Sequence, residues 1–151
     1  MDAHYHISFY KFVRLNDPLG ASVAVRALAS RHTLEGLIDV AFEGISGAVS
    51  GTWEALDQFE HALTQDAQAT SFGNAFFSMA FKRTACKTKP FHSLKVSLVA
   101  ELIKIGLTDA VNQTVDATKP SGVSLSPTEW DALLAQDDVV VIDNRNSFEF
   151  E

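Results

Sequence analysis

The order in which two kinds of apolar pattern follow one another most constrains the fold of this chain. Residues 6–13, HISFYKFV, alternate in polarity and predict a strand that is covered at least in part on both sides. Asp17 and Pro18 then predict a helix start, as N-cap and first helical residue. The apolar face expected for this helix consists of Leu19, Val23, Ala24, Ala27 and Leu28.

A hairpin and a second helix are predicted next. Residues 34–51 hold two short apolar runs around the turn-prone EGISG, where Gly44 and Gly47 permit positive φ or close backbone approach. Thr52 is a suitable N-cap for the helix that follows. Its expected apolar stripe consists of Trp53, Leu56, Phe59 and Leu63.

A further strand is predicted within residues 75–87, with Phe77, Met79 and Phe81 on one face. The resulting order β, α, β, β, α, β indicates an α+β protein with the ferredoxin-like βαββαβ arrangement. We expect this domain to span residues 1–89. No apolar run approaches the roughly 20 residues that cross a bilayer, so we expect a soluble, cytoplasmic protein with no membrane partner.

The rest of the chain changes in character. Residues 90–125 are predicted to be an extended segment followed by a polar linker. Ser126, Pro127 and Glu129 then form the pattern of a capping box at a helix start. The β-branched run at 139–143, VVVID, predicts a strand. One helix and one strand cannot bury a core of their own, so this strand needs partners from elsewhere.

Positive charge is concentrated in one part of an acidic chain. The net charge is −7, yet six of the 12 lysines and arginines lie between residues 82 and 104, where Glu101 is the only acid. The candidate phosphate contacts are Lys82, Arg83, Lys87, Lys89 and Lys95. From charge alone, the solvated face of a strand pair is the commoner explanation of such a segment, and an RNA or anion surface is the alternative.

Four segments, taken in order, resemble the bacterial tRNA uridine(34) hydroxylases. They are FYKF at 9–12, EGISGAVSG at 43–51, PFHSLKVSLVAELIKIG at 90–106 and SPTEWDALLAQDDVVVIDNRNSFEFE at 126–151. In that family a ferredoxin-like, acylphosphatase-like N-terminal domain precedes a rhodanese domain. The last segment is similar to the start of the rhodanese domain, where Asp143 and Arg145 match an IDxRNxxE motif.

The resemblance implies that the chain is the N-terminal, tRNA-positioning part of a longer enzyme that hydroxylates the wobble uridine. Residues 126–151 would be an incomplete rhodanese domain, and the loop with the catalytic cysteine would lie downstream. The chain alone is then expected to have no hydroxylase or sulfurtransferase activity. Asp143 and Arg145 would hold the fold together rather than act as an acid and base. No motif identifies a cofactor.

Three other groups of residues have the chemistry of a site. Cys86 lies among lysines and an arginine that favour a thiolate, but no catalytic motif surrounds it, and an inert thiol is the better interpretation. His4 and His6 would share a strand face as a weak metal pair, although frayed terminal histidines explain them better. Trp53 and Phe59 could stack on bases, but their spacing favours core packing.

A second hypothesis needs no chemistry at all. The chain would be a ferredoxin-like binding or assembly module of a rhodanese-related protein. Its partner could be a second copy, because the strand predicted at the C-terminal end, residues 139–151, would be unpaired and could associate with another sheet edge.

Overall fold

The structure is a computed structural model that describes residues 4–65, 72–103 and 122–143. It confirms the α+β class and divides the chain into two compact units, residues 1–119 and residues 120–151. Within the described residues, the structure contains no helix with the length and apolar character needed to cross a membrane. Each unit is described by itself below.

Unit 1, residues 1–119, is built on a five-stranded mixed sheet. Its elements are β1 (His4–Phe12), α1 (Pro18–Arg31), β2 (Glu35–Ala41), β3 (Gly44–Gly51), α2 (Trp53–Gln65), β4 (Phe81–Cys86) and β5 (Leu94–Leu98). The strand order is β4-β1-β3-β2-β5. The first four strands pair antiparallel, which confirms the predicted βαββαβ order, while β5 pairs parallel with β2. β5 lies beyond residue 89, so the sheet continues past the boundary expected from the sequence.

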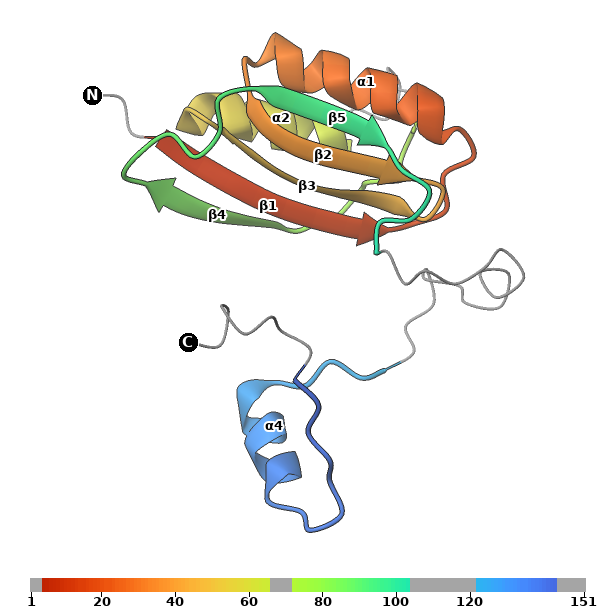
Figure 1. The fold of residues 1–151 in the computed structure, drawn as a ribbon, viewed down its shortest axis with the longest axis vertical. Coiled ribbons are helices and arrows are strands. Elements are labelled where there is room, and N and C mark those ends of the chain that lie inside the picture. The colour runs from red at the N-terminus through yellow and green to blue at the C-terminus, as the bar shows by residue number, and fades with distance from the viewer. Residues whose placement is uncertain (1–3, 66–71, 104–121, 144–151) are drawn as a thin grey trace. The chain divides into compact units, whose positions relative to one another are not determined.

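Both helices pack against the same face of the sheet (Figure 1). α1 covers β5 and β2, and α2 covers β1 and β3. The largest fully buried side chains come from both layers and, for Phe76, from the segment between α2 and β4, and they are Phe59, Phe76, Ile7, Ile38, Ile45, Leu56, Leu63, Val25, Val40 and Val49. The expectation that β1 is covered at least in part on both sides holds only in part, because Ile7 and Phe9 are buried under the helices while, on the opposite face, Ser8 is half-buried and Tyr10 is 69% exposed.

α1 begins as predicted but buries a different face. The Asp17 carboxylate accepts a hydrogen bond from the Gly20 amide at 2.8 Å, as an N-cap does. The expected apolar face is wrong in part, because Leu19 and Val23 are exposed while Leu28 is buried. The buried face consists of Pro18, Ala21, Ser22, Val25, Leu28 and Ala29. Small residues on this face let the helix backbone approach the sheet closely, which explains the choice of face.

α2 also follows its predicted cap, and the Ala55 amide donates to the Thr52 hydroxyl at 3.2 Å. Leu56, Phe59 and Leu63 form the expected buried stripe, but Trp53 does not belong to it and is 50% exposed. Trp53 lies in the first turn, at the edge of the core, where its ring packs edge-on against Tyr5 with centroids 5.2 Å apart.

The strand predicted within residues 75–87 is shorter than expected. Residues 72–78 form successive turns, in which the Phe77 amide donates to the Asn74 carbonyl at 3.0 Å. Phe77, Met79 and Phe81 therefore do not share a strand face, and Phe77 is exposed. Phe76 fills the core in place of Phe77 and contacts Phe72 at a centroid distance of 4.7 Å, while Met79 is buried as well. The alternating apolar pattern of this aromatic-rich segment therefore did not distinguish a turn from a strand.

The hairpin between β2 and β3 depends on glycine. Ala41 pairs with Gly44, which leaves a two-residue turn. Gly44 has a φ of +136°, and a Cβ there would lie 2.0 Å from the Lys11 carbonyl oxygen. Gly47 has no such φ, but a Cβ would meet the Phe9 ring at 2.9 Å. Both roles expected for these glycines, positive φ and close approach, are confirmed.

Unit 2, residues 120–151, contains α4 (Pro127–Leu134) with the predicted capping box. The Glu129 amide donates to the Ser126 hydroxyl at 3.4 Å, and the Ser126 amide donates to the Glu129 carboxylate at 2.8 Å. The strand predicted at residues 139–143 is not formed, and Val140 and Ile142 are each 84% exposed. A strand requires a hydrogen-bonded neighbour, and none of the described residues pairs with this segment.

Replacing Gly36 should test how closely the strands of the hairpin approach. Gly36 has a φ of +145°, and a Cβ there would lie 2.1 Å from the Ala48 carbonyl oxygen. Gly36→Ala should lower the free energy of unfolding by about 3 kcal/mol, through strain and steric clash together. In urea denaturation, the matched Gly73→Ala should cost only about 1 kcal/mol, because Gly73 has a φ of +51° but open space around it. Equal losses would contradict the clash.

Acid should weaken the α4 cap. The Ser126 hydroxyl, and then its backbone amide, donate to the Glu129 carboxylate and hold its pKa below the usual value. A lowered pKa in the folded state means that this contribution is present above the pKa of an unfolded glutamate and is lost as pH falls through the folded value. NMR Cα shifts of residues 127–134 should stay helical as pH falls to the pKa of an unfolded glutamate, about 4.3, and should lose helical character only at lower pH. Glu129→Gln should remove that dependence, since glutamine caps without titrating.

Candidate functional site

The face of the sheet opposite the helices carries a row of five residues in direct register. Lys82 of β4 pairs with Ser8 of β1, Ser8 with Ala48 of β3, Ala48 with Leu37 of β2, and Leu37 with Lys95 of β5. With neighbouring strands about 4.8 Å apart, the row is roughly 19 Å long. Two lysines at opposite edges of one open face are therefore separated by two small side chains and by the exposed Leu37.

The five predicted phosphate contacts differ in their surroundings. Lys82, Lys87 and Lys95 are exposed, and none of them forms an ion pair in the described part of the chain. Arg83 faces the helices instead, and Lys89 lies 2.7 Å from a carboxylate oxygen of Glu35. The structure thus brings Lys82 and Lys95 onto one face but does not bring all five residues together.

Arg83 is held by α2 from three directions. Its guanidinium lies 2.6 Å from the Glu60 carboxylate, donates to the Trp53 carbonyl at 3.3 Å, and is 4.0 Å above the centroid of the Trp53 ring. Only 15% of its side chain is exposed. These contacts are those of a residue that ties β4 to α2, and they occupy the groups that a phosphate would need.

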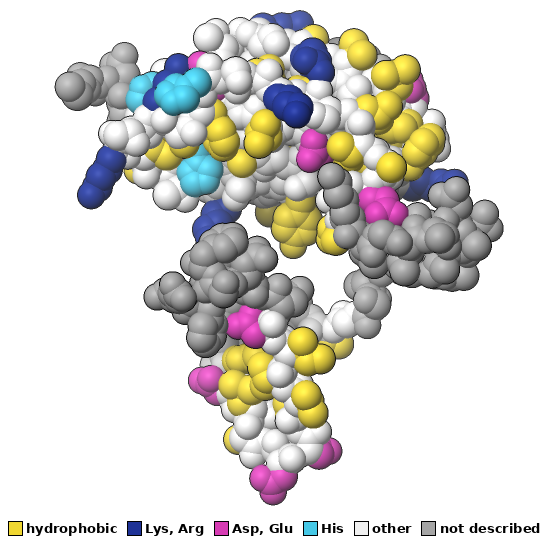
Figure 2. Space-filling model, viewed as in Figure 1, with side chains coloured by type: hydrophobic (Ala, Val, Ile, Leu, Met, Phe, Trp, Pro, Cys, Tyr) yellow, Lys and Arg dark blue, Asp and Glu magenta, His cyan; other side chains and the backbone are white. Residues whose placement is uncertain are grey.

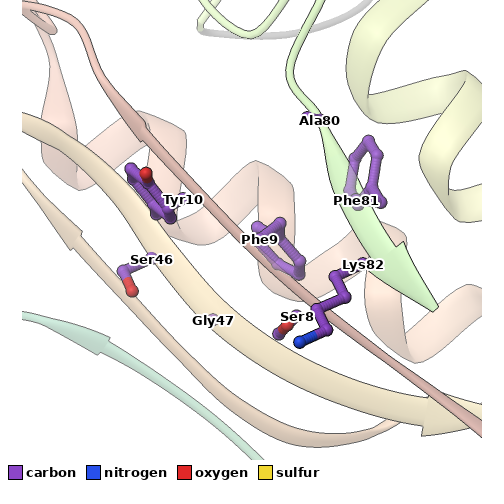
Figure 3. A pocket seen from close by; sticks show the side chains of 8 residues that line it. All are labelled: Ser8, Phe9, Tyr10, Ser46, Gly47, Ala80, Phe81 and Lys82. Carbon is purple, nitrogen blue, oxygen red and sulfur yellow. The ribbon is translucent and has the colours of Figure 1, made fainter. Parts of the chain in front are cut away.

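A groove of about 400 Å³ lies on the open face beside this row. It is lined by Ser8, Phe9, Tyr10, Ser46, Gly47, Ala80, Phe81 and Lys82. Figure 3 shows Tyr10 toward one end and Lys82 toward the other, with Ser8 on the strand between them. The groove therefore combines an exposed aromatic ring, two hydroxyl groups and an unpaired cation.

Tyr10, Ser8 and Ser46 were not among the residues predicted to form a site. Alternation in HISFYKFV does separate Ser8 and Tyr10 from the buried Ile7 and Phe9. That signal was available, but it does not say whether the second face is covered. The surface of unit 1 in Figure 2 shows lysine, arginine and histidine side chains among hydrophobic ones, as expected for a face that is neither core nor uniformly charged.

Cys86 also lies on the open face, as its predicted alternation with Phe81 implies. Its Sγ is 3.7 Å from Nδ1 of His6. His4 pairs with Cys86 across β1 and β4, so the interpretation of both histidines as frayed residues is wrong. Among the described residues no group of three histidine, cysteine or acidic side chains is arranged to hold a metal ion.

The structure describes only one of the two residues that the resemblance assigns to the start of a rhodanese domain. Asp143 is the last described residue of unit 2 and is exposed, and it makes an interaction within the structure. Arg145 lies outside the described residues. Their predicted role therefore stays a prediction.

Arg83 and its neighbour Lys82 should respond differently to truncation. Arg83→Ala should lower the free energy of unfolding by about 1–3 kcal/mol, because it leaves Glu60 without its partner and removes the cation over Trp53. Lys82→Ala should change it by less than about 0.5 kcal/mol, since that side chain is exposed and unpaired. Chemical denaturation of the two variants checks this. Similar losses would show that Lys82 has a structural role.

Comparison with known proteins agrees with this architecture. Residues 4–102 match the family model of the UPF0176 acylphosphatase-like domain. The tRNA uridine(34) hydroxylase of Bradyrhizobium diazoefficiens is 33% identical over 94% of this chain and 52% of its own length. The enzymes of the same name from Acaryochloris marina and Listeria welshimeri are 34% and 32% identical over 95% and 100% of this chain, and 42% and 44% of their own lengths. The chain thus spans about half of these relatives.

Solved structures give a weaker match. The acylphosphatase from Bacillus subtilis aligns over 63% of this chain and 98% of its own, with a TM-score of 0.42 and 18% identity. The ferredoxin-like assignment rests instead on the strand order described above. Since the family model covers the whole described sheet, the chain belongs to the family of the UPF0176 acylphosphatase-like domain, shared with the tRNA uridine(34) hydroxylases.

Proposed function

We propose that this chain is the tRNA-positioning part of a tRNA uridine(34) hydroxylase-like protein. The observation that carries the proposal is the similarity to relatives of that name, which extends over 94–100% of this chain. The open face of the sheet supports it, because Lys82 and Lys95 are exposed there without carboxylate partners among the described residues.

Local charge, rather than net charge, decides whether such binding is favourable. The chain carries −7 overall, which repels a polyanion at long range. At contact, however, salt at physiological ionic strength screens the interaction between exposed charges over a distance of about 8 Å. The lysines nearest the phosphates therefore dominate the binding energy. Two or three phosphate contacts give moderate, salt-dependent affinity, which suits a surface that positions a substrate for another part of the enzyme.

We assign the hydroxylation of wobble uridine to the full-length protein and substrate contact to this part of it. Residues 126–151 would begin the rhodanese domain, with Asp143 and Arg145 holding its first strand. The apolar side chains of Val140, Val141 and Ile142 are exposed in unit 2, and that domain would cover them. Self-association through residues 139–151 is the alternative means of covering them. A cytoplasmic location, where tRNA is found, belongs to the same proposal.

Charge reversal on the open face should weaken tRNA binding without unfolding the chain. For Lys82→Glu combined with Lys95→Glu, the slope of log affinity against log salt concentration should fall by about 1 for each lysine replaced. Fluorescence anisotropy with labelled tRNA over a salt series measures both affinity and slope. Arg31→Glu is the charge-matched control for each single reversal, Lys82→Glu or Lys95→Glu, since Arg31 is exposed in the last turn of α1, in the layer on the other side of the sheet.

Two outcomes would count against the proposal. One is the absence of any tRNA complex at low salt, where electrostatic binding is strongest. The other is an equal loss of affinity in the control variant, which would show that only net charge matters. Circular dichroism melting of each variant keeps a loss of binding separate from a loss of fold.

A further inference from the structure

We infer that the open sheet face binds a single-stranded segment of RNA, with one base stacked on Tyr10 and phosphates at Lys82 and Lys95. This inference rests on the proposed function and specifies the form of RNA and the residues that meet it. Tyr10 is the central observation, because its aromatic side chain is 69% exposed on an interior strand of the sheet, on the face that the helices do not cover.

The surroundings of Tyr10 leave room for a planar ligand. The Cα partner of Tyr10 on β3 is Ser46, and the side chains nearest along the groove are those of Ser8 and Ser46, which are small. The ring of Phe12 flanks Tyr10, with centroids 6.1 Å apart at an interplanar angle of 63°. Tyr10 therefore presents a ring beside a shallow groove, and sequence-tolerant stacking of bases on such rings is the usual way in which proteins hold single strands.

One cation lines the groove, and the other lies farther along the same open face. Lys82 lines the end of the groove away from Tyr10 (Figure 3). Lys95 lies at the other edge of the sheet, four strands away in the same row. Between them lie the small side chains of Ser8 and Ala48 and the exposed Leu37, over which an extended strand can pass. The hydroxyl groups of Ser8 and Ser46 supply hydrogen-bonding partners inside the groove.

A double-stranded segment does not fit these features as well. Its bases are paired and stacked inside the helix, so Tyr10 would have no base to contact, and only the lysines would contribute. Binding through lysines alone would not distinguish the two forms of RNA. Preference for single-stranded over double-stranded RNA, together with dependence on the Tyr10 ring, is therefore the specific consequence of this geometry.

The test uses the 151-residue chain with two probes, a uridine-rich single-stranded RNA of about ten nucleotides and the same strand annealed to its complement. The chain should bind the single strand more tightly than the duplex. Tyr10→Ala should weaken single-strand binding by roughly 5- to 150-fold, the range measured for one stacked base, and should leave duplex binding unchanged. Tyr10→Phe should retain single-strand binding, since it keeps the ring. Phe77→Ala is the matched control, because Phe77 is also an exposed aromatic residue but lies outside the groove.

The outcomes separate this inference from the proposed function. If tRNA binds in a lysine-dependent manner but Tyr10→Ala has no effect, the stacking site is wrong and the proposed function stands. If neither tRNA nor the short strand binds, both are wrong. If sedimentation shows that Tyr10→Ala abolishes self-association while RNA affinity is unchanged, the face is an interface between two copies and the inference is overturned. Unchanged melting temperatures are expected for all three variants.

Discussion

The packing of both helices against one face of the sheet is the constraint on which the rest of this structure depends. α1 approaches through small residues such as Ala21 and Ala29, and α2 inserts Phe59 and Leu56, so the core lies entirely between the helical layer and the sheet. The apolar side chains of β1, β2 and β3 that face this core are buried in register with one another. Burial of this apolar surface stabilises the fold from one side only. The second face is therefore free to carry residues chosen for other reasons.

The division between the two faces also explains how neighbouring basic residues differ in role. Arg83 and Lys82 are adjacent in the chain, but successive side chains on a strand point to opposite faces. Arg83 consequently reaches Glu60 and Trp53 of α2, whereas Lys82 faces the groove. A count of charges treats the two as equivalent. Their geometry makes one a structural cation and the other a cation available to a ligand.

Sequence reasoning succeeded where local interactions decide the outcome. The caps at Asp17, Thr52 and Ser126 depend on residues within three positions, and all three were predicted. It failed where tertiary packing decides, as on α1, where the larger residues Leu19 and Val23 were expected inside. Helical periodicity identifies an apolar stripe but not how closely a helix approaches its sheet, and close approach favoured the smaller side chains.

Only part of the candidate site could be predicted from the sequence, because the exposure of a strand residue also depends on tertiary packing. A cluster of basic residues between 82 and 104 can be found by counting, so Lys82 and Lys95 were identified. Tyr10 could not be, because an aromatic residue in an alternating strand usually packs against something. Recognising it requires knowing that both helices pack on the other face of β1. The segment VVVID shows the reverse error. Its composition predicts a strand, but composition does not say whether a neighbouring strand is there to pair with it.

The composition of the open face bears on how tightly it should hold RNA. Each stacked base contributes about 1–3 kcal/mol, and a few lysine–phosphate contacts give affinities in the non-specific range, with dissociation constants of roughly 10⁻⁴ to 10⁻⁶ M at physiological salt. A surface with one exposed ring and two or three lysines should therefore bind RNA with a dissociation constant in this range. That strength suits the proposed function, in which this part orients one nucleotide while another domain acts on it, because tight binding of substrate and product alike would slow turnover without lowering the chemical barrier.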